Sequence, residues 1–113
     1  MAETTFFVTL SPEQAAQAIE NHIVDGSITG EVIDWYVLEA PSGRSCITAV
    51  FEKHHSRAGN RLTLTVVLDD FTGYTRVHAV GGGGGEGFFR FDWGASSSFS
   101  NAPREALAEY VLN

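Results

Sequence analysis

The chain has 113 residues and a formal net charge of −7, from seven basic and fourteen acidic residues. This acidic balance argues against a nucleic-acid backbone or an anionic lipid surface as the main partner, because both are negatively charged. Hydrophobic residues make up 43% of the chain and charged residues 19%, which is typical of a globular protein. We therefore predict a single domain over residues 1–113 with no nucleic-acid partner.

The cysteine content and the N-terminus indicate where the protein works. The lone cysteine, Cys46, excludes an internal disulfide and is typical of a reducing compartment. The N-terminus has no basic segment followed by a long apolar run, so we expect no secretion signal. No apolar run approaches the ~18 residues of a membrane span. These features predict a cytoplasmic protein without a membrane partner, in which Cys46 is an inert thiol.

The first expected elements are a strand over 4–10 and a helix that follows it. Ser11, Pro12 and Gln14 form a capping box with proline at the first helical position. We expect the helix to run to about Asp25 and to end at Gly26 in the left-handed conformation. Its apolar stripe would make His22 a buried core residue rather than a ligand. The members of this stripe are Ala15, Ala18, Ile19, His22 and Ile23.

Two further strands are expected over 31–40 and 46–53. In the first, both alternating sets hold large hydrophobic residues, so the strand is either central with both faces covered or has faces that the pattern does not assign. In the second, pairing Phe51 with Leu62 aligns the apolar residues of neighbouring strands. The same register places Glu52 opposite Arg61, a favourable cross-strand pair.

The clearest pattern in the chain is the strand–turn–strand segment 61–80, RLTLTVVLDDFTGYTRVHAV. Apolar residues fall at every second position from Leu62 to Leu68, which is the period of a half-buried strand. The turn from Asp69 to Gly73 contains two aspartates that can bond the backbone and a glycine that can adopt positive φ. Pairing Leu68 with Thr75 gives one apolar face and one mixed face, as expected of an antiparallel sheet covered on one side.

The remaining elements are a strand over 88–93 and a closing helix over 103–112. If Val80 faces Phe88 across the glycine run, then His78 faces Arg90 and Arg76 faces Asp92. The closing helix is expected to bury Ala106, Leu107, Tyr110 and Val111. The order β-α-β-β-β-β-β-α predicts a two-layer α+β fold. Its antiparallel sheet has five to six strands, and the N-terminal and C-terminal helices lie on one face.

The glycine run is the one unusual feature and supplies a candidate ligand site. It is either a mobile hairpin tip or a nest of backbone N–H groups that accepts an anion. A nucleotide P-loop and a dinucleotide fingerprint do not fit, because a strand rather than a helix follows. The run comprises Gly81, Gly82, Gly83, Gly84 and Gly85.

Arg76, His78 and Arg90 are expected to lie beside this run on the polar face. They are either solubilising cross-strand pairs, with Arg76 bound to Asp92, or a polar pocket for a carboxylate or phosphate. The second interpretation makes the segment Gly81–Gly87 a binding site for a small anionic ligand. No cofactor or metal is expected, because the adjacent His54 and His55 have no recognisable ligand spacing.

The sequence supports three hypotheses about function. The favoured one is a non-catalytic domain that self-associates as a homo-oligomer through its polar sheet face or an edge strand. On that face Phe88, Val50, Val67 and Val80 could form an apolar patch that a second copy covers. The alternative is a binding module for a small anionic ligand. An enzyme comes third, because no nucleophile, metal set or carboxylate pair stands out.

At Gly59-Asn60-Arg61 before the alternating strand, and at the glycine run that leads into Phe88-Phe89, the sequence resembles an uncharacterised family of bacterial domains of about 110 residues. The resemblance covers most of the chain. It implies a bacterial cytosolic origin and no established activity.

Overall fold

The structure is a computed structural model that describes residues 2–26, 29–55, 60–83 and 99–112. The element order agrees with the predicted α+β class and its two terminal helices. The strands are β1 (Ala2–Val8), β2 (Glu31–Glu39), β3 (Ser45–His55), β4 (Asn60–Asp69) and β5 (Thr75–Gly83). The helices are α1 (Pro12–Asp25), α3 (Ala102–Ala106) and a short 3-10 helix, η3 (Ala108–Tyr110).

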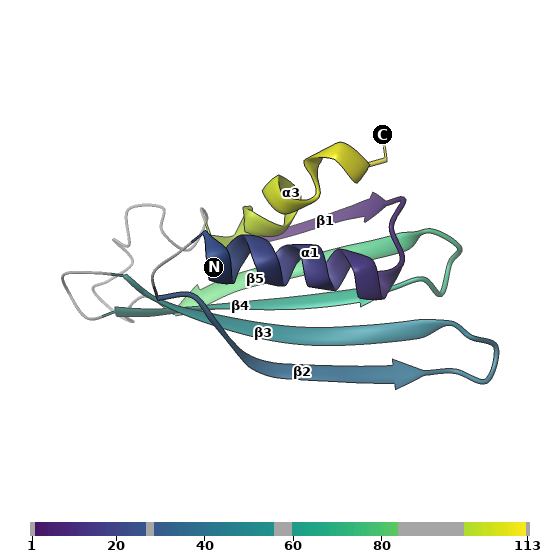
Figure 1. The fold of residues 1–113 in the computed structure, drawn as a ribbon, viewed down its shortest axis with the longest axis horizontal. Coiled ribbons are helices and arrows are strands. Elements are labelled where there is room, and N and C mark those ends of the chain that lie inside the picture. The colour runs from purple at the N-terminus through teal and green to yellow at the C-terminus, as the bar shows by residue number, and fades with distance from the viewer. Residues whose placement is uncertain (1, 27–28, 56–59, 84–98, 113) are drawn as a thin grey trace.

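The five strands form one antiparallel sheet in the order β1-β5-β4-β3-β2. Because β1 and β2 lie at opposite edges, α1 carries the chain across the sheet from one edge to the other. Figure 1 shows α1 and α3 together on one face of the sheet, and no helix of the described residues lies on the other face. None of the helices in the described ranges is long and apolar enough to cross a membrane.

The hydrophobic core lies between the sheet and α1. Alternate residues of the three central strands point into it, so each strand contributes one face and keeps the other outside. Full burial of such a side chain stabilises the fold by about 1.5–3 kcal/mol. The core side chains are Phe6, Val8, Ala15, Ala16, Ile19, Ile23, Ile47, Ala49, Phe51, Leu62, Leu64, Val66, Leu68, Val77, Ala79, Phe99, Ala102 and Leu107.

The hairpin between β4 and β5 has the predicted apolar face but a register displaced by two residues. Leu68 pairs with Val77 rather than with Thr75. A shift of two residues preserves the alternation of side chains, so the buried set is unchanged. In the observed register Asp69 pairs with Arg76, which leaves a longer loop than the predicted one. Gly73 in this loop has a φ of 116°, the positive value that the turn was expected to require.

The hairpin between β3 and β4 shows the same displacement. Phe51 pairs with Leu64 rather than with Leu62, and β3 continues through His55, so both adjacent histidines belong to the strand rather than to a loop. Glu52 lies opposite Thr63, yet Arg61 Nη1 approaches Glu52 Oε2 at 3.7 Å as a diagonal neighbour. The predicted ion pair therefore forms although the predicted register is wrong.

The edge of β5 that faces away from β4 is occupied by β1. His78 lies opposite Thr5, and Arg76 lies opposite Phe7. The expected pairing of β5 with residues 88–93, including His78 with Arg90 and Arg76 with Asp92, is therefore wrong, because each edge of a strand accepts one neighbour. Residues 88–93 themselves lie outside the described residues.

The start of α1 confirms the capping box. Gln14 N donates to Ser11 Oγ at 3.1 Å, and Ser11 N donates to Gln14 Oε1 at 3.4 Å. The end differs from the expectation, because Gly26 has a φ of −90° and is not left-handed. A glycine is needed there for space, since a Cβ would come within 2.5 Å of His22 O.

The buried stripe of α1 is rotated relative to the predicted one. It includes Pro12 and Ala16, while Ala18 is only partly buried. The rotation leaves the side chain of His22 44% exposed, so its prediction as a core residue is wrong. Hydrophobic spacing alone favoured His22, but contact with both the sheet and α3 decides which side of the helix is buried.

The C-terminal segment is less regular than the predicted helix. Helix α3 ends at Ala106, the fully buried Leu107 separates it from η3, and Tyr110 is exposed. Phe99, which lies between the predicted strand over 88–93 and the predicted helix over 103–112, is buried in the core. The sequence pattern identified the apolar residues of this segment but predicted one continuous helix, whereas the α-helix ends after the five residues of α3.

We expect Ser11→Ala to lower the free energy of unfolding by about 1 kcal/mol, because the first turn of α1 loses its side-chain acceptor. Urea denaturation followed by circular dichroism measures this change. The matched control is Thr9→Ala, an exposed site just outside the cap whose backbone bond to Tyr110 O is retained. Equal losses for the two variants would contradict the importance of the capping box.

Candidate functional site

Two of the predicted ligand-binding residues, Arg76 and His78, lie on β5 and point to the face opposite the helices. Arg76 donates from Nε to Asp69 Oδ2 and from Nη2 to Asp69 Oδ1, both at 3.2 Å. Asp69 is only 6% exposed. A bidentate, charge-assisted pair of this kind is among the stronger polar contacts in proteins. The guanidinium group of Arg76 is thus bound to a carboxylate of its own chain.

Asp69 and its neighbour Asp70 also connect the β4–β5 loop to the start of β3. Asp69 Oδ1 accepts a hydrogen bond from Phe71 N at 3.2 Å. Asp70 Oδ1 accepts one from Ser45 N at 2.9 Å, and Asp70 O accepts one from Arg44 Nη1 at 2.8 Å. The two aspartates that were predicted to form a turn therefore hold two hairpins together at this end of the sheet.

His78 is bonded across the sheet to β1. Its Nδ1 atom lies 2.7 Å from Thr5 Oγ1 and 3.9 Å from Glu3 Oε2. The carboxylate of Glu3 beside the ring opposes the approach of an anion. Arg76 and His78 are therefore neighbours on one strand, but each already has a polar partner within the chain.

The glycine run begins as strand rather than as loop. Gly81 pairs with Ala2 on one side and Leu64 on the other, Gly82 pairs with Thr63, and Gly83 pairs with Leu62. The backbone of these three glycines therefore lies within the sheet. The other predicted ligand-binding residues, Gly84, Gly85 and Arg90, lie outside the described residues. Binding of an anion at Gly81–Gly87 stays a prediction.

The structure gives no sign of metal or thiol chemistry in its described part. No group of three histidine, cysteine or acidic side chains gathers there in a way that could hold a metal ion. Partial burial raises the pKa of the Cys46 thiol, and the nearby carboxylate of Asp69 raises this pKa further. A raised pKa leaves less of the nucleophilic thiolate at neutral pH, which supports the prediction of an inert cysteine.

The two edges of the sheet differ in how they are covered. At the β1 edge the C-terminal segment adds to the strand. Leu112 N donates to Phe7 O at 2.8 Å, Thr9 N donates to Tyr110 O at 3.0 Å, and Val8 forms an isolated bridge with Val111. At the opposite edge, β2 pairs only with β3 among the residues that the structure describes. Figure 1 shows β2 at the outer margin of the sheet.

The open strand β2 carries much of the exposed apolar surface. Of the eight large hydrophobic residues that are exposed in the described part of the chain, four lie on this strand. They are Ile33 at 49%, Tyr36 at 56%, Val37 at 42% and Leu38 at 52%. Of the two alternatives that the pattern left open for this strand, the central position with both faces covered is therefore excluded.

A β-bulge explains why the sequence pattern did not assign the faces of β2. The register passes from Val32 opposite Phe51 to Asp34 opposite Val50, which leaves Ile33 as the extra residue. A bulge interrupts the period of two, so the core-facing residues change parity along the strand. Val32 and Trp35, three residues apart, consequently both pack against the core.

The backbone groups of β2 divide between its two sides. Ala40 N donates to Arg44 O at 2.8 Å across the turn to β3, so the two residues form a hydrogen-bonded pair. Because hydrogen-bonded and non-bonded pairs alternate in antiparallel sheets, the N–H and C=O groups of Trp35, Val37 and Glu39 point away from β3. This segment thus presents a row of backbone donors and acceptors beside exposed apolar side chains.

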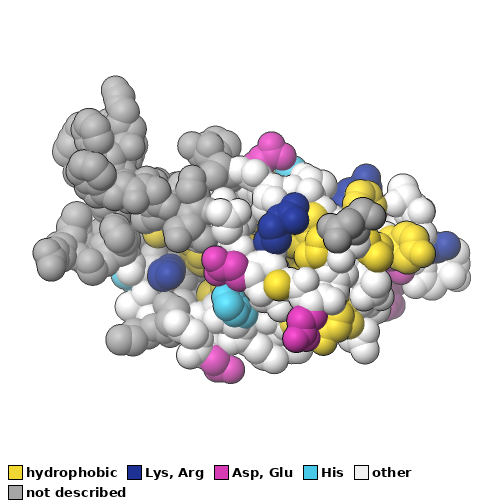
Figure 2. Space-filling view, turned by 90° about the horizontal axis from the view of Figure 1, so that it is seen from above, with side chains coloured by type: hydrophobic (Ala, Val, Ile, Leu, Met, Phe, Trp, Pro, Cys, Tyr) yellow, Lys and Arg dark blue, Asp and Glu magenta, His cyan; other side chains and the backbone are white. Residues whose placement is uncertain are grey.

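The side of the molecule that carries the helices differs in its surface side chains from the open edge of β2. Figure 2 views the molecule from this side and shows acidic, basic and histidine side chains interspersed over its middle part. Hydrophobic side chains gather toward the right-hand end of this view. Charges of one sign do not dominate the face seen in this view.

Comparison with known proteins adds one finding. The model of a family described as "Family of unknown function (DUF6054)" matches residues 1–111. This match confirms the resemblance to an uncharacterised family that the sequence indicated. No curated protein and no solved structure matches the chain.

We expect Asp69→Asn to lower the free energy of unfolding by about 2 kcal/mol, because a buried charge-assisted pair loses one partner. Urea denaturation measures the change. Asp34→Asn, which neutralises an exposed carboxylate on β2, is the control. If Asp69→Asn costs no more than this control, the two hairpins do not depend on the Asp69–Arg76 pair.

We expect the rate at which iodoacetamide alkylates Cys46 to rise with pH to a midpoint above that of the unfolded chain. The reason is that burial and the Asp69 carboxylate raise the pKa of the thiol, and only the thiolate reacts. Rates measured in buffer and in denaturant give the two midpoints. A native midpoint at or below that of the unfolded chain would show that the thiol is activated instead.

Proposed function

The chain belongs to a family of unknown function, DUF6054, and we propose that it is a non-catalytic domain that self-associates through the open edge of β2. We also propose the bacterial cytoplasm as its location, which the lone cysteine and the resemblance to bacterial domains support.

The observation that carries this proposal is the combination of exposed apolar side chains and outward backbone groups on the segment Trp35–Glu39. An edge strand of this kind is a template for pairing with another chain. Proteins that keep such an edge unpaired commonly place lysine or proline on it, and β2 has neither. Its bulge at Ile33 blunts only the first part of the strand. The regular part after the bulge remains available to a partner.

A second copy of the chain satisfies the requirements of this edge. A two-fold axis that is perpendicular to the sheet and lies beside β2 places the strand antiparallel to its copy. Each copy then donates and accepts the same set of backbone hydrogen bonds. The exposed side chains of Tyr36 and Leu38 on one face, and Val37 on the other, then meet their counterparts. The two sheets become one continuous sheet with the helices of both copies on the same side.

Electrostatics opposes this association and predicts its dependence on salt. The strand carries Glu31, Asp34 and Glu39 without a basic residue, and each chain has a net charge of −7. Two like-charged copies repel one another, and added salt screens this repulsion over about 10 Å at 0.1 M ionic strength. Association driven by backbone pairing and apolar contact should therefore strengthen as salt is added.

The alternative of a binding module for a small anionic ligand at Gly81–Gly87 has less support. Arg76 already donates to Asp69, and His78 already bonds to Thr5. The charge of Arg76 is thus already balanced by Asp69, and the carboxylates of Asp69 and Glu3 repel an added anion.

We expect the unmodified chain to form a dimer at tens of micromolar in light scattering or analytical ultracentrifugation, and Val37→Pro to be monomeric. Proline removes an N–H that points to the open edge rather than to β3, and proline is tolerated at such a position of an edge strand. The matched control is Val37→Thr, which keeps the backbone donor and the β-branched shape and should remain dimeric.

Circular dichroism establishes whether Val37→Pro keeps its sheet content. Raising the salt from about 0.05 M to about 0.5 M should tighten the dimer of the unmodified chain. A chain that stays monomeric at high salt would refute self-association. A Val37→Pro variant that associates as tightly as the unmodified chain would exclude the edge of β2 as the interface.

A further inference from the structure

A small pocket lies on the helix side of the sheet, apart from the open edge of β2 and from the polar face. Its volume is about 210 Å³, and it is formed where α1, the end of β3 and the start of the C-terminal helix meet. Pockets for drug-sized ligands measure about 300–1,000 Å³, so this one admits only a small molecule. The side chains that line it include His22, Ile23, Lys53, Phe99, Ala102 and Glu105.

The only lysine of the chain, Lys53, reaches into this pocket. It lies opposite Leu62 on the core-facing side of β3, near the point where the apolar row of that strand ends. Its Nζ atom is 5.5 Å from the centre of the Phe99 ring. Within the described residues it has no acidic partner, whereas Arg61 and Arg76 each have one. Among the residues that the structure describes, this half-buried positive charge therefore has no acidic counter-charge.

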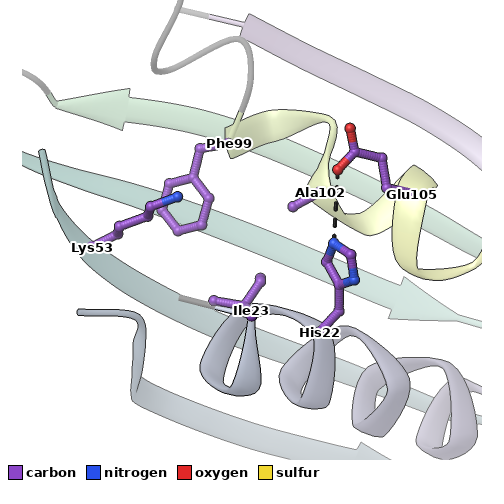
Figure 3. A pocket seen from close by; sticks show the side chains of 7 residues that line it. His22, Ile23, Lys53, Phe99, Ala102 and Glu105 are labelled. Carbon is purple, nitrogen blue, oxygen red and sulfur yellow. Dashed lines mark ion pairs between the residues drawn. The ribbon is translucent and has the colours of Figure 1, made fainter. Parts of the chain in front are cut away.

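The rest of the pocket combines buried apolar walls with one contact between a histidine and a carboxylate. Ile23, Phe99 and Ala102 are buried and form the apolar part. His22 Nε2 lies 3.7 Å from Glu105 Oε1 at the other end. Figure 3 shows the lysine nitrogen over the Phe99 ring and, across the pocket, the His22–Glu105 pair marked by a dashed line. Apolar walls with a few placed polar groups are characteristic of ligand sites.

We propose that this pocket binds a small organic carboxylate. Its carboxylate group pairs with Lys53 Nζ, and its apolar part packs against Ile23, Phe99 and Ala102. The attraction is between a single ammonium group and a single negative charge in a partly desolvated place, which makes the hydrogen bond stronger than a neutral one.

The charges of the pocket favour a carboxylate over a phosphate. A phosphate monoester carries about −1.5 to −2 charges at neutral pH and would have one cation, Lys53, to balance them. The carboxylate of Glu105 in the same pocket would repel the excess negative charge. The apolar walls also offer nothing to the remaining phosphate oxygens, whereas they match a hydrocarbon group.

The test titrates the full-length chain with benzoate, benzamide and benzamidine, which share one shape and differ in charge. Binding is followed through the NMR signals of the Ile23 and Ala102 methyl groups. We expect saturable shifts with benzoate and an affinity for benzamide that is weaker by about tenfold or more, because benzamide cannot form the charged hydrogen bond. Benzamidine should not bind, and added salt should weaken the binding of benzoate.

Variants then test whether Lys53 supplies the positive charge that binds benzoate. Lys53→Met keeps the length of the side chain and should weaken benzoate binding by about tenfold or more, while Lys53→Arg should retain it. Arg61→Met is the matched control, since it removes one positive charge from the opposite face of the sheet and should leave binding unchanged.

Three results would overturn the proposal. They are the absence of saturable methyl shifts with benzoate, equal affinities for benzoate and benzamide, and a Lys53→Met variant that binds benzoate as the unmodified chain does. The comparison of benzoate, benzamide and benzamidine on the unmodified chain tests the proposal even if Lys53→Met does not fold.

Discussion

The structure depends on burying one face of the sheet against α1. Because alternate residues of β3, β4 and β5 point into the core, each pairing of these strands can change only in steps of two residues. A step of one residue would expose the whole row from Leu62 to Leu68 and bury Thr63 and Thr65 in its place. In the observed register of β4 and β5, Asp69 lies opposite Arg76, and the two side chains form a bidentate pair.

The position of β1 determines which surfaces of the protein remain open. By pairing with β5, β1 occupies the edge nearest the glycine run and leaves β2 at the far edge of the sheet. The chain then covers the β1 edge with its own C-terminal residues, through the bonds from Leu112 and to Tyr110. No comparable segment of the described chain covers β2. The edge with the exposed apolar residues is thus a consequence of topology rather than of local composition alone.

The pocket arises because the helix layer does not cover the whole length of the sheet. Figure 1 shows that the sheet extends past the end of α1 at Asp25. In its last part β3 changes from apolar to charged residues. Lys53 keeps the core-facing direction of the row that contains Phe51, but the helix layer no longer fills the space in front of it. An amine group is consequently held against the Phe99 ring beside apolar walls. The family match assigns no activity to this pocket or to the open edge.

The sequence by itself determined the α+β class, the capping box of α1, the buried face of the β4–β5 hairpin and the role of Gly73 in its turn. These features depend on interactions between residues close in the chain, or on an alternation that survives a shift of two residues. It also identified Arg76 and His78 as neighbours on the polar face, but not their partners Asp69 and Thr5.

Only the tertiary structure decided that β1 rather than residues 88–93 pairs with β5, that β2 lies at an edge, and that His22 is exposed. Each of these outcomes depends on which distant segment occupies a given edge or face, and local hydrophobic patterns carry no information about that choice. The bulge at Ile33 interrupts the alternation of inward and outward side chains, so the sequence pattern could not assign the faces of β2. The surroundings of Lys53 come from three separate elements, so no spacing within the sequence could indicate them.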